Sequence, residues 1–160
     1  MRITTEDPAT PDIVSLLEAH LADMRHTSPP ESIHVLDVDA LRRPHITFVT
    51  ARDEDGALLG MGAIAEINPT HAELKSMRTH PAARGQGVAT SVLRHLLDTA
   101  SDRNYARVSL ETGSPAFFAP AHRLYERHGF TQCEPFGSYV LDPFSRFYTL
   151  ELADGAPVTP

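Results

Sequence analysis

The sequence has little of what would point to a secreted, metal-binding or membrane protein. Its single cysteine, Cys133, cannot form an internal disulfide, and a zinc site built on paired cysteines is impossible. No apolar run approaches the ~18 residues that a membrane span needs. The opening segment, MRITTEDPATPD, is acidic and lacks the apolar core of a signal peptide. We therefore expect a soluble, cytoplasmic protein with no membrane partner.

Positive charge is also scarce. The chain has 14 Lys and Arg against 21 Asp and Glu, which gives a net charge of −7 with its nine histidines neutral. A nucleic-acid-binding protein presents a basic face to phosphates, so we expect no nucleic-acid partner. A negative field attracts protonated amines, which biases the protein toward cationic partners.

Length and hydrophobic pattern predict one α/β domain over residues 1–160, because 160 residues with 41% apolar content can bury a core of their own. The β-branched and aromatic run ITFVTAR and the apolar run LLGMGAIAEI flank an acidic, glycine-ended turn, which predicts an antiparallel hairpin, and a β-α-β crossover follows it. The first helix is expected to begin with Thr10 as its cap and Pro11 at its first position. Expected strands cover 3–5, 46–52, 58–67, 72–79, 105–112, 131–135 and 146–152, and expected helices cover 11–24, 38–42, 88–103 and 120–128.

The most informative segment is MRTHPAARGQGVATSVL, which runs from Met77 to Leu93. A predicted strand ends there, two glycines flank Gln86, and a predicted helix begins at once. Glycines in such a loop let backbone N–H groups point toward one spot, where the helix dipole adds partial positive charge. The loop is therefore a candidate cradle for a phosphate or pyrophosphate, and Arg84 at its rim can add a charge-assisted hydrogen bond.

Spacing alone leaves other interpretations of this loop open. A strand-to-helix turn can use glycine for its geometry only. A dinucleotide-binding fingerprint needs GxGxxG, of which Gly85 and Gly87 match the first two, and Glu111 lies near where a ribose-binding acid would stand. After the hairpin, however, too little chain remains for a doubly wound sheet. A Walker P-loop is excluded because its Gly-Lys-Ser/Thr is missing.

A second motif decides between these interpretations. Residues 84–89 fit the pattern Arg/Gln-x-x-Gly-x-Gly/Ala, and AHRLYERHGF at 121–130 fits A-x-x-L-Y-x-x-x-G-F. In this order and separation, the two motifs resemble those of the GNAT superfamily of N-acetyltransferases. The likeness covers the chain from Ile3 to Leu152. Four segments further resemble a bacterial subgroup of small GNAT proteins: ELKSMRTHP, SLET, FAPAHRLYERHGF and CEPFGSYVLDP.

The resemblance implies a GNAT fold, which is a mixed, mostly antiparallel sheet flanked by helices. Its central parallel strands, here 72–79 and 107–112, are expected to splay apart around acetyl-CoA, the cosubstrate. The first of them would pair with the pantetheine arm, and backbone N–H groups of the glycine loop would hold the pyrophosphate. The residues so implied are Met77, Arg78, Thr79, Arg84, Gly85, Gln86, Gly87, Val88, Ala89 and Thr90. We expect no metal, since no histidine pair has HxxxH or HExxH spacing.

Acetyl transfer to an amine also needs a base and an acid. The attacking amine must be neutral although a lysine-like amine has a pKa of ~10.4, and a carboxylate, directly or through a water molecule, can take its proton. The resemblance assigns Tyr125 as the general acid that faces the CoA sulfur; the alternative is a half-buried packing tyrosine. Glu73 is the first candidate for the base and Glu111 the second, each otherwise a solvated or ion-paired strand residue. A backbone N–H near Met77 would meet the thioester oxyanion.

The sequence departs from the family pattern at Phe118, where many GNAT proteins have an asparagine that contacts CoA. This aromatic residue is expected to pack over the pantetheine or to line the acceptor pocket. His122 is expected on the exposed side of its helix. Three other histidines lie near the segment that covers the acceptor in this fold and are candidates for substrate contact: His26, His34 and His45.

The sequence therefore predicts an acetyl-CoA-dependent N-acetyltransferase that moves an acetyl group to a primary amine of a small molecule by direct transfer in a ternary complex. Two alternatives stay open: a protein lysine or N-terminal acetyltransferase, and a CoA-binding regulatory module without catalysis. The oligomeric state also stays open. A homodimer is one option, because dimers are common among the proteins that this chain resembles.

Overall fold

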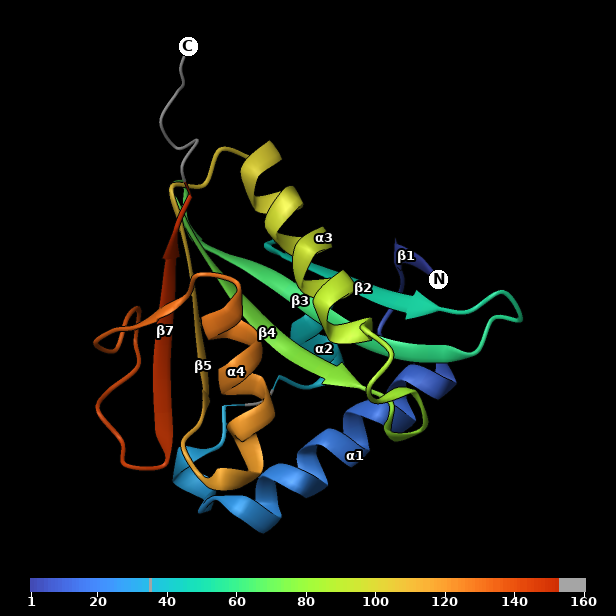
Figure 1. Cartoon of the computed structure of the whole chain (residues 1–160), viewed down its shortest axis with the longest axis horizontal. Coiled ribbons are helices and arrows are strands. Elements are labelled where there is room, and N and C mark those ends of the chain that lie inside the picture. The colour runs from blue at the N-terminus through green and yellow to red at the C-terminus, as the bar shows by residue number, and fades with distance from the viewer. Residues whose placement is uncertain (35, 153–160) are drawn as a thin grey trace.

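A computed structural model describes residues 1–34 and 36–152 of the chain (Figure 1). The strands are β1 (Arg2–Thr5), β2 (Ile46–Arg52), β3 (Leu58–Asn68), β4 (His71–Thr79), β5 (Arg107–Gly113), β6 (Thr131–Gln132) and β7 (Ser145–Glu151). The helices are α1 (Pro11–Thr27), α2 (Val38–Leu41), α3 (Val88–Asp102) and α4 (Ala119–Arg127), with short 3-10 turns η1 (Pro30–Ser32), η2 (Pro81–Ala83) and η3 (Ala116–Phe118). Within the described ranges, none of the helices has the length and apolarity to cross a membrane.

The strands form one sheet in the order β1-β2-β3-β4-β5-β7-β6. Neighbouring strands are antiparallel except β4 and β5, which run parallel because α3 crosses over between them. β2 and β3 form the predicted hairpin. The predicted mixed, mostly antiparallel sheet with one central parallel pair is therefore confirmed.

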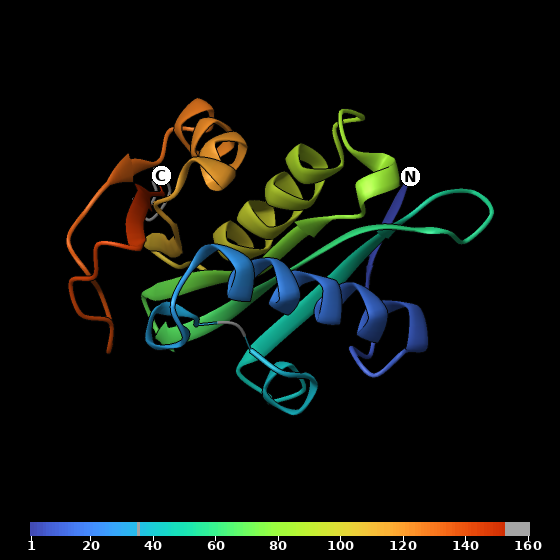
Figure 2. The ribbon, with the colours of Figure 1, turned by 90° about the horizontal axis from the view of Figure 1, so that it is seen from below.

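Helices cover both faces of this sheet. α3 and α4 lie on one face and α1 and α2 on the other (Figures 1 and 2). Successive strand residues point to opposite faces, so neighbours in one strand enter different cores. In β2, Phe48 packs in the core with α1, and Val49 packs in the core with α3. The buried stripe of α3 follows the predicted helical period: Val88, Val92, Leu93, Leu96 and Ala100.

β4 and β5 are paired over only part of their length. Their ladder ends at Leu74 and Leu110, although both strands continue beyond this point. The divergence coincides with a bulge in β4, where Ser76 adopts the left-handed conformation with φ 56° and the register with β3 shifts. Figure 1 shows the two strands diverging behind α4. The predicted splayed pair is present, and it opens a gap through the middle of the sheet.

Three local expectations need correction. Thr10 occupies the cap position of α1, but its hydroxyl donates to the Asp7 carbonyl oxygen and does not cap the helix. β6 is shorter than predicted, because Pro135 has no N–H to continue the ladder beyond the bond from the Cys133 N–H to the Phe147 oxygen. His122 is buried rather than exposed: its Nε2 lies 2.7 Å from the Gly113 carbonyl oxygen.

Close packing of α3 on the sheet depends on Gly62 of β3. A Cβ added there would lie 2.6 Å from Met77 Sδ and 2.8 Å from Val92 Cγ1. We expect Gly62→Ala to lower the free energy of unfolding by about 1–3 kcal/mol, as overpacked cores do, measured by urea denaturation. Adding Val92→Ala removes one clashing group, so the double variant should lose less than the two single losses together. Strict additivity would contradict this packing account.

Candidate functional site

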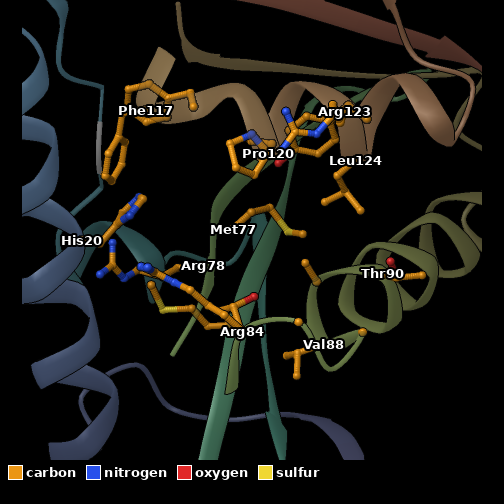
Figure 3. A pocket seen from close by; sticks show the side chains of 18 of the residues that line it. His20, Met77, Arg78, Arg84, Val88, Thr90, Phe117, Pro120, Arg123 and Leu124 are labelled. Atoms are coloured by element: carbon orange, nitrogen blue, oxygen red, sulfur yellow. The ribbon is translucent and has the colours of Figure 1, made fainter. Parts of the chain in front are cut away.

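A groove of about 610 Å³ lies between α3 and α4, with the end of β4 along its floor (Figure 3). It collects the residues that sequence analysis assigned to the cosubstrate, with the exception of Gln86. Gln86 lines instead a separate hollow beside α1. The predicted residues that line the groove are Met77, Arg78, Thr79, Arg84, Gly85, Gly87, Val88, Ala89 and Thr90.

The glycine loop at one end of the groove fits an anionic ligand. Gly85 and Gly87 both have φ 78°, a conformation that favours glycine, and a Cβ on either residue would meet no atom within 4 Å. The open space lies directly before the first turn of α3, which begins at Val88 and leaves its leading N–H groups without helical partners. Since the sheet is mostly antiparallel, the dinucleotide-fold alternative does not apply.

The opposite wall of the groove carries His20 of α1 and Arg78 of β4, whose side chains face each other in Figure 3. Burial, followed by the nearby Arg78 charge, lowers the pKa of His20 to about 4, so its imidazole is neutral at pH 7. Arg78 is tied to α1 by a bond from Nη1 to Asp23 Oδ2 at 2.7 Å. These contacts hold α1 against the gap between the strands.

Tyr125 of α4 lies where this groove meets a second, smaller cavity of about 120 Å³, and it lines both. The residue is 5% exposed, and its ring packs edge-on against Phe130 with centroids 5.6 Å apart. Burial raises the pKa of the hydroxyl, which is therefore protonated at neutral pH. In the described part of the chain, that hydroxyl has no hydrogen-bond partner. It is therefore available to a ligand.

Glu111 of β5 lines the small cavity on the far side of the gap from α4. Its Oε2 accepts a hydrogen bond from Ser145 Oγ at 2.7 Å, and it forms no ion pair among the described residues. Burial raises the pKa of this carboxyl, and the Ser145 bond opposes that shift. A buried carboxylate with a raised pKa has the properties of a general base.

Glu73 of β4 is differently placed, since it lines neither cavity. Its Oε2 accepts from Tyr139 Oη at 2.5 Å and from Lys75 Nζ at 3.1 Å. Its Oε2 is already engaged in these two bonds, whereas Glu111 lines the small cavity. The geometry therefore favours Glu111 over Glu73, the reverse of the order that sequence position favoured.

Several residues that line the small cavity were not singled out from the sequence as site residues. They include Lys75 and Ser76 of β4. Tyr139 of the β6–β7 segment accepts a hydrogen bond from Lys75 Nζ. Phe118 lines both cavities. Of the three histidines proposed for substrate contact, His34 lines the cavity. Within residues 1–34 and 36–152, no group of His, Cys, Asp and Glu could hold a metal ion.

Comparison with known proteins agrees with this geometry. The model of the acetyltransferase (GNAT) family matches residues 13–130. The chain belongs to the GNAT acetyltransferase family. As a GNAT acetyltransferase it takes the acetyl group from acetyl-CoA, and the groove fits that molecule: it has an open glycine cradle, a helix N-terminus and an unpaired strand edge.

Two curated GNAT relatives are similar over nearly their whole length. The uncharacterized N-acetyltransferase YedL of Escherichia coli (strain K12) is 47% identical over 95% of both chains. The uncharacterized N-acetyltransferase YsnE of Bacillus subtilis (strain 168) is 48% identical over 95% of this chain and 100% of the relative. Among solved structures, an acyl-CoA N-acyltransferase described as putative, from Klebsiella pneumoniae, matches with a TM-score of 0.80, 28% identity, and coverage of 94% of this chain and 97% of that one.

The glycine cradle makes a direct prediction for acetyl-CoA binding. Gly87→Ala puts a methyl group into the space in front of α3, and we expect the dissociation constant for acetyl-CoA, measured by calorimetry, to rise at least about tenfold (~1.4 kcal/mol). Gly56→Ala in the β2–β3 turn is the matched control, because Gly56 also has positive φ and open space around its Cβ position. Gly56→Ala should lower the free energy of unfolding by a similar amount and leave the dissociation constant for acetyl-CoA unchanged. Equal binding losses in both variants would contradict the cradle.

Proposed function

We propose that this GNAT protein transfers the acetyl group directly to a primary amine of a small molecule bound in the 120 Å³ cavity. The observation that carries the proposal is the position of Tyr125, which lines both the cosubstrate groove and the cavity. The gap between β4 and β5 connects the two faces of the sheet at this point. Donor and acceptor can therefore meet through the sheet.

In the proposed reaction, an N–C bond forms between the amine and the acetyl carbonyl carbon, and the C–S bond of the thioester breaks. Glu111, directly or through a water molecule, takes the proton that the amine loses. Tyr125 supplies a proton to the leaving sulfur. In this proposal, the backbone N–H of Met77, which follows the bulge and lines the groove, stabilises the negative charge on the carbonyl oxygen.

The size and the covering of the small cavity both support a small-molecule acceptor rather than a protein chain. Its volume lies below the ~300–1,000 Å³ of sites for drug-sized ligands. Ser32 of η1 donates to Asp142 Oδ2 at 2.6 Å and so joins η1 to the β6–β7 segment. His34 and Tyr139 continue this cover with ring centroids 4.9 Å apart. A lysine on a protein surface would have to displace these contacts.

The role of Tyr125 is tested by Tyr125→Phe. We expect kcat in a thiol-release assay to fall about 100-fold, as when a general acid is removed. Because the hydroxyl lacks a partner within the described chain, stability should not change. Tyr105→Phe is the control: its Oη donates to Glu66 Oε1 at 2.6 Å, away from the groove. It should lose about 1 kcal/mol of stability and keep kcat. An unchanged kcat in Tyr125→Phe would remove this residue as the acid.

The role of Glu111 is tested through pH. Its raised pKa means that the base form is lost, as pH falls, at a higher pH than for an ordinary carboxyl, so kcat should decline on the acid side above pH ~4.3. Glu111→Gln should lower kcat about 100-fold or more and abolish that decline. Burial disfavours the ionised form, so the neutral variant should be at least as stable at pH 7.

Glu66→Gln is the matched control for this substitution and should leave the pH profile of kcat unchanged. If Glu111→Gln retains the acid decline, the base lies elsewhere.

A further inference from the structure

Lys75 is the only lysine of the chain, and the fold places it in the acceptor cavity. Its side chain is only 13% exposed. Lysine is usually solvated at the surface, and burying its charge is costly unless partners compensate. Glu73 supplies such a partner at 3.1 Å, and Tyr139 Oη accepts a second hydrogen bond at 2.8 Å. The position of this one lysine therefore needs an explanation.

The ammonium group of Lys75 has one donor left over. An ammonium carries three N–H donors and no acceptor. Two are used by Glu73 Oε2 and Tyr139 Oη, and no third partner occurs in the described part of the chain. Because Lys75 lines the cavity, a bound molecule can accept the third bond. The ligand atom that it meets has to be a hydrogen-bond acceptor, and an anionic oxygen suits it best.

Ser76, the next residue, independently indicates a polar ligand. It lines the same cavity, and its hydroxyl is buried without a hydrogen-bond partner among the described residues. Its φ of 56° is uncommon for a residue other than glycine, and such strain concentrates at functional sites. Buried hydroxyls are nearly always hydrogen-bonded in folded proteins. A ligand oxygen would give this hydroxyl a partner.

The acceptor amine lies, under the proposed function, toward Glu111 and the gap. Glu73 and Lys75 of β4 share a strand face, and Lys75 and Glu111 of β5 both line the cavity. A simple alkylamine has no oxygen to offer Lys75 and Ser76. A zwitterion offers both groups: its amine toward Glu111 and its carboxylate toward Lys75. It also adds no net charge to a cavity that is already lined by Glu111, Lys75 and His34, with Glu73 bonded to Lys75 beside it.

We propose that Lys75 and Ser76 bind a carboxylate of the acceptor, so that the substrate is an amino acid or a similarly small amine with a carboxylate close to the amine. This inference rests on the proposed function and narrows its substrate class. The small volume of the cavity limits how far apart the two groups of the acceptor can lie.

The inference is tested with matched pairs of acceptors that differ only in the carboxylate, such as alanine and ethylamine, histidine and histamine, or phenylalanine and phenethylamine. In a thiol-release assay with saturating acetyl-CoA, we expect kcat/KM to favour the carboxylated member of at least one pair by tenfold or more. Ser76→Gly relieves the backbone strain and removes the hydroxyl. It should raise KM for the amino acid without changing KM for acetyl-CoA.

Two further variants separate recognition from folding. Lys75→Met alone leaves Glu73 buried without its partner, so the double variant Lys75→Met/Glu73→Gln restores the charge balance. It should lose the preference for the carboxylated acceptor while remaining folded. Ser15→Ala, on α1 away from the cavity, is the matched serine control and should keep that preference.

The single lysine also provides a readout that does not depend on turnover. Protein labelled with [13C]lysine gives one side-chain Cε signal, which should shift when the preferred amino acid is titrated in the presence of CoA and stay in place with its decarboxylated amine. Equal use of both members of every pair, with no shift, overturns this inference and leaves the proposed function intact. Acetyl-CoA binding without turnover of any of these compounds overturns the proposed function.

Discussion

The structure depends on one interruption in the hydrogen bonding of its sheet. β4 and β5 pair as parallel strands up to Leu74 and Leu110, and then the ladder ends in the middle of a seven-stranded sheet. Buried backbone groups need partners, so strand edges exposed at this point favour a ligand that can form strand-like hydrogen bonds. The bulge at Ser76 turns β4 away from β5 and keeps the two edges apart. We propose that acetyl-CoA binds in this gap.

The remaining elements are arranged around that gap from both faces. On one face of the sheet, α3 and α4 carry the glycine loop and Tyr125. On the other face, α1, η1 and the β6–β7 segment cover the cavity proposed for the acceptor. The glycine-loop end of the groove also explains how an acidic protein with a net charge of −7 binds a polyanionic cosubstrate. Backbone N–H groups before α3, with Arg84 at the rim of the groove, supply local positive potential that the overall charge does not.

Features encoded by contiguous residues could be predicted from the sequence. The hairpin, the stripe of α3 and the glycine loop rest on local periodicity and turn chemistry, and the groove formed where the two motifs indicated. The relative merit of Glu73 and Glu111 could not be predicted. It depends on Tyr139, which lies 66 residues from Glu73 in sequence and bonds to it in space. No sequence pattern indicates the left-handed backbone of Ser76. The burial of His122 could not be predicted either, because it depends on a hydrogen bond with a carbonyl group of β5.

Amide hydrogen–deuterium exchange with and without acetyl-CoA tests the central claim most directly, because it reports which backbone N–H groups gain a partner. The account predicts slower exchange in peptides that cover residues 75–79 and 84–90, with no change in the hairpin strand at 46–52. Protection of the glycine loop without protection of 75–79 would contradict the claim that acetyl-CoA binds in the gap between β4 and β5.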